Sequence, residues 1–218
     1  MASIPGATAY PAIPPLDKIG NHRGLSVHAA APLKGFTPEK ERVILLKTLT
    51  TVASVALPIE ERWSIKRCRY APDGESVGRV CIATGTHGDE MMGQLIVYLV
   101  QQRIAAHPDA LRGTVDFYPM LNPLGLDIGE RMVPSGTRLD MNRAFPGSPD
   151  GTPLEYMCYQ VIQDMRGADF VLDLHASARN KSELYEVRVS AKEADRLLPR
   201  VRALCPQLIW VYPDKGSF

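Results

Sequence analysis

The stretch RVCIATGTHGDEMMGQLIVYLVQQRIAA, residues 79–106, decides the fold. Its first part, residues 79–84, is a short run dominated by apolar side chains, which is typical of a strand buried on both faces. Its last part, residues 91–106, has the length and composition of a helix. The two parts are linked by GTHGDE, residues 85–90. A buried strand that leads through a polar loop into a helix indicates an α/β domain.

The rest of the chain repeats this alternation. We predict strands at residues 62–70, 115–122, 169–176, 183–189 and 207–212, and helices at 154–165 and 191–204. Strands that alternate with helices, some of them apolar throughout, predict a mixed, mostly parallel sheet with helices on both faces. This is the expected fold class.

The N-terminal part has a different composition. Residues 1–36 are rich in proline, glycine and alanine, and we expect an arm that lies on the surface or on a partner subunit. Residues 37–218 are expected to form the folded domain. We predict that this domain begins with a helix over residues 37–54, because Thr37 and Pro38 form a helix start and Leu45 and Leu49 have helical spacing.

The composition excludes several classes of partner. The 218 residues are 45% apolar and 22% charged, with a net charge of +1. No basic run points to nucleic acid, and no apolar stretch approaches the ~20 residues of a membrane helix. The four cysteines are far apart and form no CxxC pair, and the N-terminus has no signal-peptide pattern. We therefore expect a cytoplasmic protein in a reducing compartment.

Polar residues at the ends of two predicted strands form a candidate metal site. His87 and Glu90 follow the strand at 79–84, and His175 closes the strand at 169–176. Ligands of open α/β sheets bind beyond the carboxyl ends of the strands. Two histidines and a glutamate are a known ligand set of catalytic zinc, which keeps a fourth position for water.

Each of these residues also has an ordinary explanation. Glu90 and Asp89 could complement the dipole of the helix that follows them, and Asp89 could instead orient a ligand. His175 alone could be a hydrogen-bonded histidine at a strand end. The residues by themselves leave these alternatives open.

A long loop predicted over residues 123–151 adds candidate substrate ligands. Its charged and amide side chains include Arg131, Arg138, Asp140, Asn142 and Arg143. An arginine binds a carboxylate through two parallel hydrogen bonds, and an asparagine supplies a further donor. The alternative is a solvated loop in which the arginines pair with nearby carboxylates, and we favour it for Arg138.

Four blocks of this sequence resemble the succinylglutamate desuccinylase/aspartoacylase family, whose members share the zinc-carboxypeptidase fold. GTHGDE resembles the zinc motif GxHGxE, and LDMNRAFPG resembles the segment DLNRxFPG. VLDLHAS resembles the strand that carries the third zinc ligand, and NPLGLDIGER the stretch that ends in a functional arginine. The order and spacing of the blocks match from about residue 79 to residue 180, which is more specific than any block alone.

The resemblance implies a role for each matching residue. His87, Glu90 and His175 would hold one zinc ion per chain. Arg131 would polarise the scissile carbonyl and stabilise the oxyanion, and Asn142 and Arg143 would bind the free carboxylate of the substrate. The implied reaction is zinc-dependent hydrolysis of the amide bond of an N-acyl amino acid or a similar small carboxylate. A zinc carboxypeptidase acting on peptides, or a metal- and carboxylate-binding protein without turnover, are the alternatives.

The general base of the family has no match here. In the family it is a glutamate on a later strand, whereas this chain ends at Phe218. We therefore expect a C-terminally incomplete domain that is impaired by the missing glutamate. Glu183 or Glu186 as a substitute base, and a non-catalytic chain, stay open. An incomplete sheet would leave an open edge, which favours association, so a homo-oligomer is also open.

Overall fold

A computed structural model describes residues 45–57, 60–134, 139–177 and 181–213. All of them belong to one compact unit, Glu41–Phe218. The predicted arm, residues 1–36, and the predicted helix start at Thr37 lie outside the described residues. In the described part, no helix has the length and apolar character needed to cross a bilayer.

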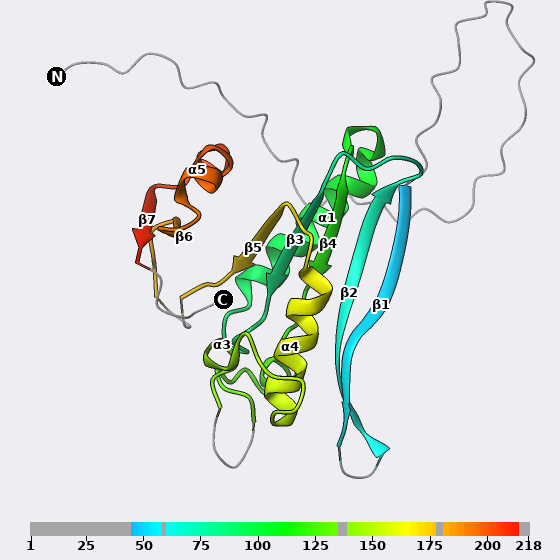
Figure 1. The fold of residues 1–218 in the computed structure, drawn as a ribbon, viewed down its shortest axis with the longest axis vertical. Helices are drawn as coiled ribbons and strands as arrows, with labels where there is room; N and C mark the ends of the chain where they lie inside the picture. Colours follow the sequence, from blue (N-terminus) through cyan, green and yellow to red (C-terminus); the bar gives the residue numbers. More distant parts are fainter. Residues whose placement is uncertain (1–44, 58–59, 135–138, 178–180, 214–218) are drawn as a thin grey trace, which may run out of the picture. The chain divides into compact units, whose positions relative to one another are not determined.

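A five-stranded mixed sheet forms the centre of this unit (Figure 1). Its strands are β1 (Leu45–Ala56), β2 (Arg62–Pro72), β3 (Arg79–Thr84), β4 (Thr114–Tyr118) and β5 (Phe170–Leu174), in the order β1-β2-β4-β3-β5. β3 pairs in parallel with β4 and with β5, whereas β2 is antiparallel to both β1 and β4. The predicted mixed α/β sheet is confirmed, and β3 is central to its parallel half.

Helices cover both faces of the sheet, as predicted (Figure 1). On one face Ala83 of β3 belongs to the same apolar core as Met157 of α4 (Pro153–Met165). On the other face Phe117 of β4 belongs to a second core with Val97 of α1 (Met92–Ala106). Successive side chains of a strand point to opposite faces, so the apolar strands of the parallel half supply both cores.

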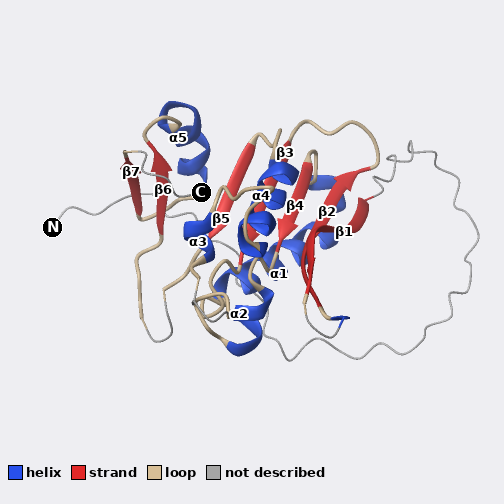
Figure 2. Ribbon diagram, turned by 60° about the horizontal axis from the view of Figure 1, so that its bottom comes forward, coloured by secondary structure: helices blue, strands red, loops and turns tan. Residues whose placement is uncertain are grey.

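Short elements complete the described part. They are η3 (Pro108–Ala110), α2 (Pro123–Ile128), α3 (Met141–Ala144), β6 (Glu186–Ser190), α5 (Ala194–Ala203) and β7 (Leu208–Tyr212). β6 and β7 pair in parallel as a separate two-stranded sheet (Figure 2). The strands and helices predicted after residue 60 are confirmed, although most boundaries differ by a few residues and the strand predicted over 115–122 ends at Tyr118.

The helix predicted over residues 37–54 is wrong where the structure describes it. Leu45–Ala56 forms the strand β1, which pairs antiparallel with β2 along its whole length. Four of the five residues at 48–52 are threonine or valine, whose branched side chains favour strands. The apparent helical spacing is misleading because Leu49 is 67% exposed and the core contact is made by Ala53.

The long loop predicted over residues 123–151 contains two short helices, so this prediction is also wrong in part. Asn122 caps α2 by accepting a hydrogen bond from the backbone N–H of Gly125. Asp140 caps α3 by accepting one from the backbone N–H of Asn142. These helices are too short to show a period of apolar residues, which is why the sequence pattern did not predict them.

A buried network of charges ties the sheet to the end of α4. Asp116 of β4 is fully buried and accepts two hydrogen bonds from Arg69 (2.7 and 2.8 Å) and one from Arg79 (2.7 Å). Arg79 also donates to the backbone carbonyl of Asp164 (2.7 Å), in the last turn of α4. Because a helix leaves its last carbonyls without partners, this contact caps α4.

Candidate metal centre

The loop between β3 and α1 contains two positions, 85 and 88, at which the structure requires glycine. A Cβ atom at Gly88 would collide with the backbone of Gly125 and with the carbonyl oxygen of Glu130. The N–H of Gly88 donates to that same oxygen (3.0 Å), so the two loops touch backbone to backbone. Gly85 has a φ of 74°, in the region that glycine adopts at least cost. These constraints position the polar residues of GTHGDE.

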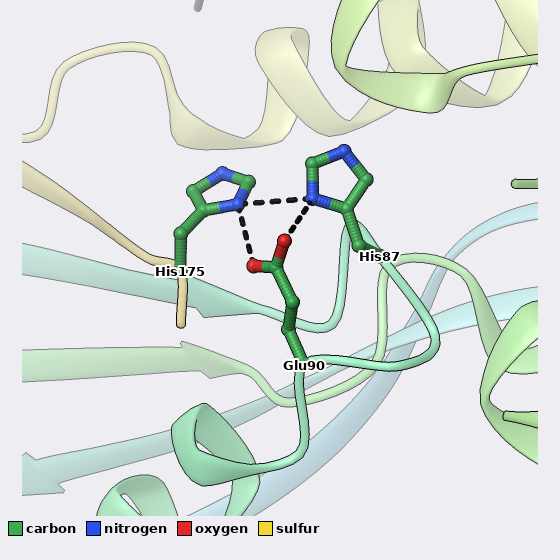
Figure 3. A group of neighbouring side chains, drawn as sticks. All are labelled: His87, Glu90 and His175. Atoms are coloured by element: carbon green, nitrogen blue, oxygen red, sulfur yellow. Dashed lines mark hydrogen bonds and ion pairs between the residues drawn. The ribbon is translucent and has the colours of Figure 1, made fainter. Parts of the chain in front are cut away.

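His87, Glu90 and His175 converge at one end of the sheet (Figure 3). His87 and Glu90 follow β3, and His175 directly follows β5, the parallel neighbour of β3. Glu90 Oε1 lies 2.8 Å from His87 Nδ1, and Glu90 Oε2 lies 3.0 Å from His175 Nδ1. The two Nδ1 atoms are 3.2 Å apart. The three side chains therefore form a group that could hold a metal ion.

A further carboxylate binds the outer nitrogen of each imidazole. His87 Nε2 lies 3.1 Å from Asp140 Oδ1, and His175 Nε2 lies 2.8 Å from Asp173 Oδ2. With a metal ion at the centre, a proton on Nε2 would donate to this outer carboxylate and leave the lone pair of Nδ1 for the ion. Histidines that bind metals usually have such a partner on the other nitrogen. The donor set therefore fits a divalent ion.

The electrostatics of the group favour a positive charge at its centre. Burial alone would raise the pKa of Glu90, but hydrogen bonds from His175, His87 and the N–H of Ala176 outweigh it and hold this pKa far below its usual range. Burial would lower the pKa of His175, but Asp173 and Glu90 raise it to about 10. The carboxylates that stabilise a proton on His175 would also stabilise a metal cation at this position.

Arg131 lies beside the candidate ligands, as the resemblance implies. Its Nη1 donates to Glu90 Oε1 (2.8 Å), and its Nη2 lies 3.9 Å from Asp140 Oδ2. The Arg131 side chain is 42% exposed, whereas that of Glu90 is 6% exposed. The Arg131 side chain therefore contacts the cluster and is also partly exposed.

Asn142 and Arg143 belong to α3, whose cap is attached to the cluster. Asp140 Oδ1 accepts from the backbone N–H of Asn142 (2.9 Å) and also lies next to His87 Nε2. The start of α3 is thereby held beside the candidate ligands. The substrate-binding role of the Asn142 and Arg143 side chains stays a prediction, and Arg138 lies outside the described residues.

The contacts of Asp140 and Asp173 with the two imidazoles were not predicted from the sequence. A signal was present for Asp173, because it stands two residues before His175 and alternate residues of an extended chain share a face. For Asp140 no local pattern was sufficient, since its contact with His87 spans 53 positions of the chain. Both contacts arise from tertiary structure.

The two glutamates considered as general bases lie near β6. Glu186 begins this strand, and its Oε1 accepts a hydrogen bond from Arg188 Nε (2.8 Å). Glu183 precedes the strand and is exposed. Neither observation assigns a catalytic role to these residues.

Comparison with known proteins identifies the family. Residues 76–214 match the succinylglutamate desuccinylase/aspartoacylase catalytic domain, and the chain belongs to this family. Over 98 residues it is 35% identical to an N-alpha-acetyl-L-2,4-diaminobutyric acid deacetylase of Halomonas elongata. This match covers 44% of the chain and 27% of that relative.

Solved structures share the fold. One is a succinylglutamate desuccinylase/aspartoacylase from Rhodobacter sphaeroides, with a TM-score of 0.63 and 20% identity, covering 81% of this chain and 54% of that one. Another is a metallo-carboxypeptidase from Burkholderia cenocepacia, with a TM-score of 0.60 and 17% identity, covering 78% and 49%. The zinc-carboxypeptidase-like fold is confirmed, and the chain spans about half the length of these structures.

Proposed function

We propose that this chain is a zinc-dependent hydrolase domain that cleaves the amide bond of an N-acyl amino acid or a similar small carboxylate. One observation carries the proposal. His87, Glu90 and His175 converge beside the partly exposed side chain of Arg131. Membership of the family and a relative named as a deacetylase support this class of reaction.

The spacing of the ligand atoms supports zinc. Tetrahedral coordination at ~2.0–2.1 Å separates two ligand nitrogens by roughly 3.3 Å. The two Nδ1 atoms of His87 and His175 are 3.2 Å apart. Three protein ligands would leave an open coordination position, as in catalytic zinc sites. When bound, one zinc ion per chain would polarise the substrate carbonyl and lower the pKa of a water molecule to about 7.

The other residues would bind and orient. Arg131 would donate to the amide oxygen as it gains negative charge, a contact whose loss costs about 3 kcal/mol of barrier in comparable enzymes. Asn142 and Arg143 would hold the free carboxylate of the substrate through charge-assisted hydrogen bonds. Asp140 and Asp173 would keep the two imidazoles oriented.

Proton transfer is the step to which the described residues assign no group. The reaction needs a base within reach of the attacking water. Glu90, Asp140 and Asp173 each bind an imidazole, so using one of them as the base would loosen the cluster. We therefore include in the proposal that this chain by itself is impaired in turnover.

Two other functions each have one observation in their favour. Similarity to a metallo-carboxypeptidase favours cleavage of peptides at a free carboxyl end. The carboxylates around the cluster already contact the imidazoles, which favours a protein that binds metal and carboxylate without turnover.

Metal analysis tests the shared premise. We expect purified protein to contain about one zinc per chain, and His87→Ala to contain almost none, because it removes one of three ligands. His107→Ala is the matched control, since His107 follows α1 and is exposed. Wild-type protein without zinc, after dialysis against zinc and removal of excess, would refute all three functions.

Substrate panels then separate the functions. We expect slow hydrolysis of N-acetyl and N-succinyl amino acids, faster than that of dipeptides, and stimulation by acetate or formate acting as an external base. Arg131→Ala should retain zinc but lose activity about 100-fold. Faster cleavage of dipeptides would favour the carboxypeptidase, and no hydrolysis by zinc-loaded protein would favour the protein without turnover.

A further inference from the structure

Asp140 contacts three parts of the candidate site with one carboxylate. Its Oδ1 lies 3.1 Å from His87 Nε2 and accepts a hydrogen bond from the backbone N–H of Asn142 (2.9 Å). Its Oδ2 lies 3.9 Å from Arg131 Nη2. A single oxygen, Oδ1, therefore connects a candidate metal ligand to the first turn of α3.

Helix α3 depends on this cap more than a longer helix would. It has only four residues, Met141–Ala144, and so short a helix gains little from its own hydrogen bonds. Its first N–H groups need an acceptor from outside the helix, and for Asn142 that acceptor is Asp140. The position of Asp140 Oδ1 therefore affects the candidate carboxylate-binding residues, Asn142 and Arg143.

The backbone on both sides of Asp140 is anchored. The carbonyl oxygen of Leu139 accepts a hydrogen bond from the N–H of Val133 (2.9 Å). Met141 is fully buried and belongs to the apolar core to which α4 contributes. Because these contacts keep the chain in place, a change in the hydrogen bond to His87 should act on the start of α3 instead of displacing the loop.

We propose that Asp140 is a positioning residue that couples two parts of the candidate site, so that a divalent ion held by His87 strengthens the binding of a carboxylate by Asn142 and Arg143. The coupling rests on the proposed function and links its metal site to its carboxylate site. A cation at His87 Nδ1 polarises the imidazole and makes its Nε2–H a stronger donor to Asp140 Oδ1. The cap of α3 is then held more firmly, because it uses the same oxygen.

Coupling between two binding sites is reciprocal. If zinc raises the affinity for a carboxylate by some factor, the carboxylate raises the affinity for zinc by the same factor. We expect a factor of about 5, at the lower end of the usual range, because one hydrogen-bonded oxygen makes the link. If Asp140 only oriented His87, its substitution would lower the affinity for zinc but leave this factor unchanged.

Competition with a chromophoric chelator measures the coupling. The probe is levulinate, in which a carbon replaces the amide nitrogen of N-acetylglycine, so the probe cannot be hydrolysed. We expect saturating levulinate to raise the zinc affinity of the wild type about 5-fold. In Asp140→Ser the hydroxyl can still cap α3 but is too short to reach His87, so the factor should fall to about 1.

Asp173→Asn is the matched control. It should also weaken zinc binding, but the carboxylate of Asp173 binds the imidazole of His175 instead of the cap of α3, so the factor should stay at about 5. Loss of the factor in both variants, or in neither, would overturn the coupling and leave the proposed function intact. A wild type that binds no zinc would refute both.

Deuterium exchange gives a readout that needs neither the probe nor a variant. The N–H groups of Asn142 and Arg143 donate to Asp140 Oδ1 and to the carbonyl oxygen of Asp140. Zinc should slow their exchange about 5-fold relative to protein with a chelator. The N–H of His107, which donates to the carbonyl oxygen of Arg103 at the end of α1, is the control and should not change. Equal exchange at Asn142 with zinc and with chelator would overturn the coupling.

Discussion

At the residue scale, the candidate site depends on carboxylates that hold the imidazoles as much as on the ligands themselves. Asp173 lies 2.8 Å from His175 Nε2, and Asp140 lies 3.1 Å from His87 Nε2. With a bound ion, each contact would favour the tautomer that carries its proton on Nε2 and leaves the lone pair of Nδ1 to the ion. The contact with a carboxylate matters more for orienting His175, because its side chain is 33% exposed whereas that of His87 is 1% exposed.

Asp173→Asn tests this orienting role. We expect the affinity for zinc to fall about 10–100-fold, since an amide is a weaker acceptor than a carboxylate and lacks its charge. Competition with a chromophoric chelator measures the change. Asp169→Asn is the control near the same strand, because Asp169 Oδ2 accepts from the backbone N–H of Arg79 (2.7 Å) instead. Equal affinities in both variants would show that Asp173 does not orient His175.

At the element scale, one buried carboxylate joins three strands. Asp116 of β4 binds Arg69 of β2 and Arg79 of β3. Burial would raise the pKa of Asp116, but the hydrogen bonds from Arg69 and Arg79 outweigh it and place this pKa below its usual value. A carboxyl with a depressed pKa stabilises the fold above its unfolded pKa of about 3.9, and this contribution is lost as the pH falls through the folded pKa.

Asp116→Asn should lower the free energy of unfolding at neutral pH by about 3 kcal/mol, because it removes the buried charge that pairs with the two partly buried arginines Arg69 and Arg79. Urea unfolding measures the change. Glu193→Gln is the control, since the Glu193–Arg196 pair on the surface should contribute less than about 1 kcal/mol. Below pH ~4 the wild type should lose stability more steeply than Asp116→Asn. Parallel pH profiles would contradict the role of this carboxylate.

At the scale of the whole molecule, the candidate ligands connect segments that are far apart in the chain. His87 and Glu90 follow β3, and His175 follows β5, so a bound ion would link the ends of two neighbouring strands. An ion that binds only the folded chain stabilises it by an amount set by its free concentration relative to Kd. Metal binding should therefore be visible in global stability.

Zinc at about 1,000 times its Kd should raise the free energy of unfolding by about 4 kcal/mol. Denaturant unfolding with zinc and with a chelator measures the difference. His175→Ala should respond at most weakly, because it loses a ligand that comes from the second strand. An equal response of His175→Ala and the wild type would place zinc elsewhere.

Local sequence patterns predicted the parallel half of the fold and the candidate ligands. β3 and α1 form where a short apolar run and a helical run flank the glycines of GTHGDE. His87, Glu90 and His175 stand at strand ends, and the carboxyl ends of parallel strands meet at one edge. The prediction that they converge needed only the order of strand and helix.

The sequence by itself thus determined the alternation of strand and helix, the turn glycines and the types of ligand, because these depend on contacts between near neighbours. Tertiary structure alone decided that Leu45–Ala56 is a strand, since its stability comes from pairing with β2. It also decided the partners of His87 and the exposed side of α1. The apolar residues of α1 are spread around most of the helix, so the side that is covered depends on what packs against it and is not specified by their period.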